Sequence, residues 1–161
     1  MLAVFTVVLM ASLFTHEIAH KIVAQRMGLW AEFRLTFMGV VLTLFSMVSP
    51  LFKIVSPGAV MVAGVADRQS IGRISIAGPV TNIGLSVVFL AFTFLVPQFP
   101  LIFLLGATFN AWIALFNLVP YGMLDGFKVF LWNKRSWALA FAVSLVLTLV
   151  SYTLILPRIS P

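Results

Sequence analysis

Four long apolar stretches make up most of the chain, and each is about long enough to cross a membrane. They run over residues 1–26, 74–96, 101–119 and 137–156. A helix needs about 20 predominantly apolar residues to span the hydrocarbon core of a bilayer, so the pattern predicts four transmembrane helices. Pro97 and Pro100 flank a tight turn after the second stretch, and Lys134 and Arg135 precede the fourth. Pro79 would lie near the start of the second helix, where proline is tolerated.

The segment between the first two stretches, residues 33–64, has a different pattern. It is apolar and rich in Val, Phe, Leu and Thr, but glycine, proline and lysine interrupt it. Such punctuation is typical of short strands joined by turns. Open strands cannot face lipid, because their amides would lack hydrogen-bond partners. We therefore expect a small β-structure at the membrane interface or against the helices. A fifth span through residues 35–48 is the alternative that the pattern leaves open.

The composition agrees with a multi-pass protein of the lipid bilayer. The chain is 62% hydrophobic and 9% charged, whereas a soluble domain carries about 25% charged residues. There is no cysteine, so no disulfide framework exists. The expected fold class is an all-α membrane protein with a small β-structure inserted between its first two helices, forming a single domain over residues 1–161. The abrupt end after the fourth stretch leaves open that this is the core of a longer protein.

The net charge of +6 could suggest a nucleic-acid partner, but the basic residues are scattered at the ends of the spans. We therefore expect no nucleic-acid binding. The segments after the first and third spans hold most of the basic residues, namely Arg34, Lys53, Arg68, Arg73, Lys128, Lys134 and Arg135. Cytosolic loops carry the excess of Lys and Arg, so both termini are expected outside. Arg158 is the one residue that opposes this orientation.

The chain has two histidines, and they lie four residues apart in His16-Glu17-Ile18-Ala19-His20. Positions i and i+4 share one face of a helix, so both imidazoles can bind one zinc ion, with Glu17 beside it as a general base. Ten residues separate His16 from Arg26, which puts the motif about 15 Å from the cytosolic end of the span. An ionisable residue at membrane depth indicates function.

A third ligand must come from elsewhere, because a catalytic zinc site takes three protein ligands and an open position. The acidic residues number four. Glu32 and Asp67 lie near basic neighbours in the polar region, and we expect them on the solvated surface. Asp125 is the remaining carboxylate in an apolar context. It could instead cap the N-terminus of a helix over residues 127–132, or serve as both ligand and cap.

Three motifs in order give the chain a family resemblance. They are His16-Glu17-x-x-His20, then Ala77-Gly78-Pro79-x-x-Asn82, then Asn117-x-x-Pro120 with Asp125-Gly126 after four more residues. In this order, within an apolar chain, they resemble the site-2 proteases, which are intramembrane zinc metalloproteases.

The resemblance implies one Zn²⁺ per chain, bound by His16, His20 and Asp125, with Glu17 catalytic. Asn117 would position the substrate or stabilise the oxyanion, and Asn82 is a further candidate for substrate binding. Hydrogen bonding between helices is the alternative role for both asparagines. Residues 33–64 would be the family's membrane-associated β-structure, with a turn over residues 56–59 that includes Gly58.

The function expected is hydrolysis of peptide bonds within transmembrane segments of membrane-protein substrates. A substrate helix must unwind before cleavage, and the unwound segment could pair with an exposed edge of the inserted sheet near Gly58. We expect a prokaryotic cell membrane as the location, with the active site toward the cytosol. Two alternatives remain: a membrane metal transporter that uses the same His/Asp cluster, and a non-catalytic relative that binds helices. The oligomeric state stays open.

Overall fold

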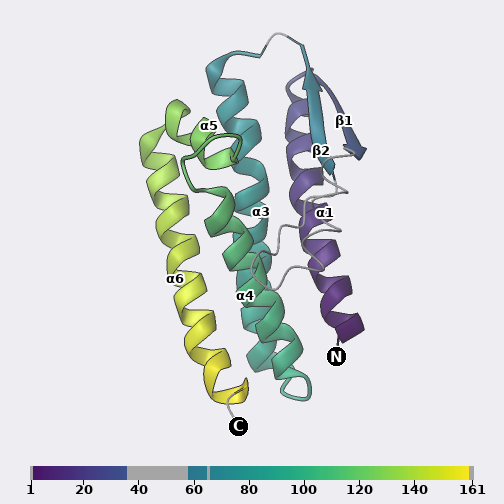
Figure 1. Ribbon diagram of the computed structural model, residues 1–161, viewed down its shortest axis with the longest axis vertical. Helices are drawn as coiled ribbons and strands as arrows, with labels where there is room; N and C mark the ends of the chain where they lie inside the picture. The colour runs from purple at the N-terminus through teal and green to yellow at the C-terminus, as the bar shows by residue number, and fades with distance from the viewer. Residues whose placement is uncertain (1, 36–57, 65, 160–161) are drawn as a thin grey trace.

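Four long helices run side by side and form the body of the molecule (Figure 1). The computed structural model describes residues 2–35, 58–64 and 66–159, and side chains over 6–32, 62–64 and 66–158. The elements in chain order are α1 (Leu2–Arg26), β1 (Trp30–Leu35), β2 (Gly58–Ala63), α3 (Arg68–Leu95), α4 (Pro100–Asn117), α5 (Asp125–Trp132) and α6 (Lys134–Ile159). Helices α1, α3, α4 and α6 are long and apolar enough to cross a membrane. Together with the small sheet between α1 and α3, they confirm the predicted fold class.

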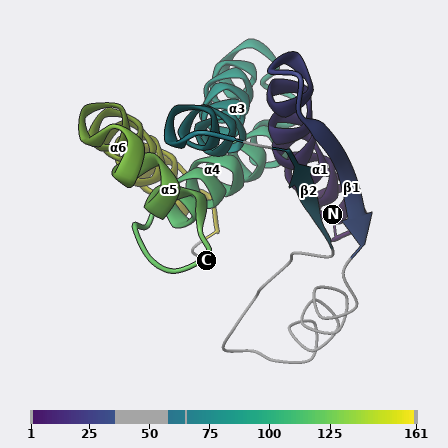
Figure 2. The same ribbon diagram turned by 90° about the horizontal axis from the view of Figure 1, so that it is seen from above.

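The arrangement of the helices is clearest from above (Figure 2). Helix α4 packs between α3 and α6, α1 packs on α3, and the β1–β2 pair lies against α1. Three fully buried alanines on α4, at positions 107, 111 and 114, let its neighbours approach closely. Small residues are common at helix contacts in membranes. The hydrophobic effect does not drive helices together in lipid, so their association depends on close packing. The beginning of α1 and the end of α6 lie at the same end of the bundle (Figure 1).

Helix α3 begins earlier than the apolar pattern predicted. It starts at Arg68 rather than at residue 74, because the side chain of Asp67 accepts a hydrogen bond from the Ser70 backbone N–H at 2.8 Å and caps the first turn. The helix therefore extends past the apolar segment into a polar turn. As a result Pro79 lies in the interior of the helix and not near its start. Interior prolines are tolerated in membrane helices because neighbouring groups can satisfy the freed carbonyl.

The two strands pair antiparallel, from Trp30 opposite Ala63 to Leu35 opposite Gly58. Helix α1 ends in a Schellman turn, in which Gly28 has φ of 76° and the Leu29 N–H bonds to the Ala24 carbonyl at 3.1 Å. A positive φ at this position favours glycine. The turn sends the chain directly into β1, so the sheet is held against the end of α1.

The turn expected over residues 56–59 does not fit the structure. Gly58 and Ala59 belong to strand β2, because they pair with Leu35 and Arg34. Residues 56 and 57 lie outside the described residues, as does almost all of the alternative span over residues 35–48, whose first residue is the end of β1. Gly58 is thus the first residue of a strand and does not lie in a turn between strands.

Candidate metal centre

Helices α1 and α5 bring three potential metal ligands together. His16 and His20 lie one turn apart on α1, and their Nε2 atoms are 3.1 Å from each other. The Oδ2 atom of Asp125, the first residue of α5, lies 3.3 Å from Nε2 of His16 and 3.1 Å from Nε2 of His20. A tetrahedral zinc ion with bonds of about 2.0–2.2 Å holds its ligand atoms about 3.3–3.6 Å apart. The three atoms are therefore close to the spacing of three ligands of one ion.

The other ring nitrogen of each histidine determines the tautomer. Nδ1 of His16 lies 2.5 Å from Oδ1 of Asn82, and Nδ1 of His20 lies 2.7 Å from the Ile74 carbonyl oxygen. Both partners are carbonyl oxygens, which accept hydrogen bonds and do not donate them. Each Nδ1 must therefore carry a proton, which leaves Nε2 as the nitrogen of each ring that can bind a metal. Metal-bound histidines are held in the same way by an outer partner.

Asp125 reaches the histidines because of the backbone around it. The short connection after α4 includes Gly122 with φ of 57°, and Leu124 is the residue that precedes the first turn of α5. The alternative that Asp125 caps this helix is wrong, since Leu124 occupies the cap position. A Cβ at Gly126 would overlap the backbone of Leu118. The glycine lets α5 start directly against the end of α4, which turns the carboxylate toward α1.

The charge of Asp125 suits a metal ligand. Burial by itself would raise the pKa of this carboxyl, but the imidazoles of His16 and His20 that face it outweigh burial and hold the pKa below its ordinary range. The carboxylate is therefore anionic near neutral pH. Lys128, one turn later on α5, lies 3.9 Å from the other carboxylate oxygen, Oδ1. Oδ2 faces the histidines and Oδ1 faces the lysine.

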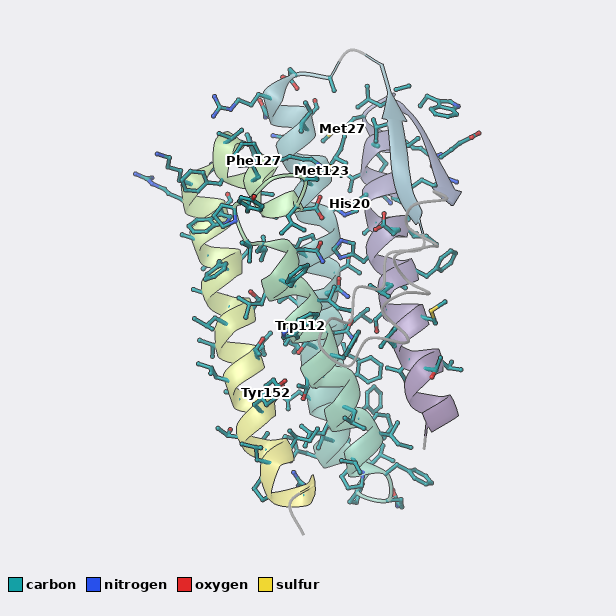
Figure 3. All side chains as sticks on the ribbon, in the orientation of Figure 1. His20, Met27, Trp112, Met123, Phe127 and Tyr152 are labelled. Atoms are coloured by element: carbon teal, nitrogen blue, oxygen red, sulfur yellow. The ribbon has the colours of Figure 1, made fainter. Side chains whose placement is uncertain are left out.

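Helix α3 approaches the two histidines closely. Gly78 faces the histidines so closely that a Cβ there would overlap both Nε2 atoms. His16 and His20 are only 4% and 7% exposed, so the helices enclose the cluster. Figure 3 shows His20 on the side of α1 that faces α3, in the half of the bundle that carries α5 and the strands. Among the described residues, this is the one group of His, Asp and Glu side chains that could hold a metal.

The remaining predicted residues take different positions. Glu17 is partly buried on α1, between the two histidines in sequence. Asn117 donates from Nδ2 to the Ile113 carbonyl of its own helix at 3.0 Å. Asn82 faces His16, which is the interhelical hydrogen bond left open as its alternative role. Gly58 lies in β2, away from the three ligand residues in sequence and on a separate element.

Two groups in the hydrogen bonds around the histidines were not found from the sequence. The Ile74 carbonyl belongs to the backbone of an ordinary apolar residue, so no side-chain signal marks it. Asn110 of α4 bonds to Asn82 and is fully buried in the bundle. Its polar side chain within an apolar stretch was a detectable signal, because such residues usually bond to another helix in a membrane.

Comparison with known proteins identifies two relatives. A protein of Methanocaldococcus jannaschii is 32% identical over 128 residues, which cover 77% of this chain and 67% of that protein. Rip3 of Mycobacterium tuberculosis, found from two strains, is 36% identical over 139 residues, which cover 80% of this chain but 31% of Rip3. Both carry the name "putative zinc metalloprotease". No protein-family model and no solved structure matches the chain.

Proposed function

Since this chain belongs to the site-2 protease family of zinc metalloproteases, we propose that it is an intramembrane endopeptidase that hydrolyses peptide bonds within transmembrane segments of other proteins. The observation that carries the proposal is the cluster of His16, His20 and Asp125 inside the helices. Both histidines lie within the candidate span Thr6–Arg26, at about 9 and 15 Å from its end near the sheet. A hydrolytic site at that depth suits a substrate that also lies in the bilayer.

The three ligands would hold zinc through two imidazole nitrogens and one carboxylate oxygen, a common set for catalytic sites. When bound, zinc polarises the scissile carbonyl and makes water more acidic. Glu17 accepts the proton of the attacking water and passes it to the leaving amine. On a helix with about 100° per residue, Glu17 is about 60° around the axis from His20. It therefore flanks the ligand face at a position from which it can reach the reacting groups.

Asn117 is proposed to bind the substrate carbonyl as charge develops on its oxygen. An amide nitrogen carries two hydrogens, and the bond to Ile113 uses one of them. The other can donate to the substrate, provided that the side chain keeps its place at the end of α4. A donor aimed at the developing oxyanion stabilises the transition state more than the ground state.

The proposed substrate-binding element is the β1–β2 pair. A transmembrane helix hides its amides in its own hydrogen bonds, so it must unwind before cleavage. An unwound segment can pair with the edge of a strand, where hydrogen bonds between backbones give affinity and place few demands on the amino-acid sequence of the substrate. The pair lies against α1, the helix that carries both histidines and Glu17 (Figure 2).

The proposed orientation places the strands and α5 on the cytosolic side. Most basic residues of the described segments lie at that end, at positions 68, 73, 128, 134 and 135, while Arg158 lies at the other. The ends of α1 and α6 would face the outside. The organisms of the relatives support a prokaryotic cell membrane. Exposed apolar side chains such as Phe94, Leu139 and Leu149 would contact lipid.

The decisive experiment replaces the proposed base and leaves the ligands intact. Purified protein in detergent is incubated with a transmembrane substrate, comparing wild type, Glu17→Gln and Asp67→Asn. General-base catalysis contributes about 10²–10⁴-fold, so Glu17→Gln should lose that much cleavage and keep its zinc. Asp67, an exposed aspartate that caps α3, provides the control; because asparagine also caps helices, this variant should cleave normally.

Other results would contradict the proposed mechanism or favour an alternative function. Equal cleavage by wild type and Glu17→Gln would remove Glu17 as the base. No cleavage by either protein, together with zinc uptake into sealed vesicles, would favour a transporter. Transporters place several ionisable groups along a path, whereas the described residues hold a single His/Asp cluster.

A further inference from the structure

A continuous chain of hydrogen bonds joins helix α4 to the metal centre. Asn110 of α4 accepts at Oδ1 from Nδ2 of Asn82 on α3, at 2.8 Å. Oδ1 of Asn82 then accepts from Nδ1 of His16 on α1. Ser12, one turn before His16, accepts from both asparagines: its Oγ from Asn110 at 2.9 Å, and its backbone carbonyl from Asn82 at 3.3 Å. The chain thus connects three helices around one ligand.

The direction of every bond in this chain is determined by backbone carbonyls. Nδ2 of Asn110 donates to the Gly106 carbonyl at 2.9 Å, one turn earlier on α4. The Ser12 hydroxyl donates to the Val8 carbonyl at 2.7 Å and so presents a lone pair to Asn110. The Gly106 carbonyl and the Ser12 hydroxyl oxygen both accept from Nδ2 of Asn110, so Oδ1 of Asn110 must face Asn82. Because Oδ1 is an acceptor, Asn82 has to turn its NH₂ group toward it.

The consequence for Asn82 is that its oxygen faces His16. If its amide were turned over, two acceptors would meet at Asn110 and the NH₂ group would face Nδ1 of His16. That nitrogen would then have to accept a hydrogen bond, and the proton would move to Nε2, where the metal binds. Asn82 and Asn110 are both 0% exposed, so no solvent is present to satisfy the misplaced groups.

We propose that Asn110 is a positioning residue of the metal centre. Together with the more distant Ser12 carbonyl, it fixes the orientation of the Asn82 amide, and through it the His16 tautomer that leaves Nε2 for zinc. The proposal rests on the proposed zinc site and extends it to a residue on a helix that supplies none of the three ligands. Outer partners of metal-binding histidines typically change metal affinity by about 10–100-fold when replaced.

The test is a double-mutant cycle read out as zinc affinity. Zinc dissociation constants are measured by competition with a chromophoric chelator for wild type, Asn110→Leu, Asn82→Asp and the double variant. Asn110→Leu is expected to weaken zinc binding about 10–100-fold in the wild-type background. In the Asn82→Asp background, Asn110→Leu should cause no further loss of zinc affinity. Both oxygens of a carboxylate accept hydrogen bonds, so either of them can accept from Nδ1 of His16.

Two outcomes overturn the proposal. If Asn110→Leu weakens zinc binding equally in both backgrounds, the residue acts through packing and not through the amide. If it changes zinc affinity in neither background while wild type binds zinc, Asn110 has no role at the centre. A wild-type protein that binds no zinc would instead refute the proposed function, so the two failures are distinguishable.

Further variants separate folding from positioning. Asn110→Asp keeps an acceptor toward Asn82 and should retain more zinc affinity than Asn110→Leu; equal losses would count against the proposal. Ser86→Ala removes another bond between α3 and α4, from Oγ to the Ala107 carbonyl at 2.9 Å, and should leave zinc affinity unchanged. Nitrogen NMR of the zinc-free protein gives the tautomer directly. The chain has only two histidines, and in Asn110→Leu the His16 nitrogens should show the proton on Nε2 and no longer on Nδ1.

Discussion

The metal centre and the β1–β2 pair lie in the same half of the molecule, but they are built in opposite ways. The centre is enclosed by helices, and each histidine nitrogen faces a defined partner. The strands form a two-stranded sheet on the outside of α1, and Trp30 and Val62 are 46% and 40% exposed. Of the described strand side chains, Ala31 is the one that is buried, packed against Ala24 and Ile74.

This difference separates two requirements of the proposed intramembrane protease. Chemistry needs ligands and a base held to within a fraction of an ångström, which buried hydrogen bonds can provide. Recognition of many substrates needs an element that bonds to any backbone. Changes at the centre should therefore remove zinc or turnover, whereas changes at the strands should raise KM and leave kcat nearly unchanged.

The largest effect is expected from Asp125→Asn. The amide has nearly the same size but no negative charge, so the centre loses its one anionic ligand. Zinc affinity should fall by about 100-fold or more, and cleavage should fall to background. Zinc content after dialysis gives the first measurement and substrate cleavage the second. Asp67→Asn is the matched control: asparagine also caps helices, so zinc and activity should stay normal. Full zinc content in Asp125→Asn would exclude Asp125 as a ligand.

A smaller but still severe effect is expected from Gly78→Ala. The added methyl group would overlap Nε2 of both histidines, so it competes for the space of the ion. Zinc affinity should fall at least about tenfold, and overpacking should cost about 1–3 kcal/mol of stability. Gly84→Ala on the same helix is the control, since a Cβ there meets nothing within 4 Å. Thermal unfolding with and without zinc measures both effects. Equal zinc affinity in the two variants would show that the close approach of α3 does not matter.

From the sequence, the three candidate ligands could be selected but most of their surroundings could not. The spacing of His16 and His20 and the scarcity of carboxylates led to three residues that the fold brings within 3.1–3.3 Å. These inferences needed only helix periodicity and the ligand requirements of zinc. The start of α3 was placed at residue 74 because hydropathy detects apolar segments, whereas the helix begins in a polar turn capped by Asp67.

The hydrogen bonds around the histidines were beyond sequence reasoning for a physical reason. Asn82, Asn110 and Ser12 lie 28 to 98 positions apart along the chain, and their meeting depends on how three helices rotate and cross. An apolar stretch fixes the existence of a helix but not its rotation. Each asparagine alone is compatible with many partners, so the direction of the chain of bonds becomes visible only in three dimensions.

The smallest effect is expected at the strands, from Gly58→Pro. Gly58 begins β2 opposite Leu35, and proline removes its N–H and constrains φ. If the unwound substrate pairs with this sheet, the loss of about one hydrogen bond should raise KM about 2–10-fold, while kcat and zinc content stay near wild type. Val62→Thr changes an exposed side chain of the same strand with little change of shape, and should leave KM unaltered, because pairing uses the backbone. Steady-state kinetics on a transmembrane substrate measures both. An unchanged KM in Gly58→Pro would count against strand pairing. A fall in kcat together with loss of zinc would mean that the metal centre depends on the sheet for its structure, so that the two regions are not separable.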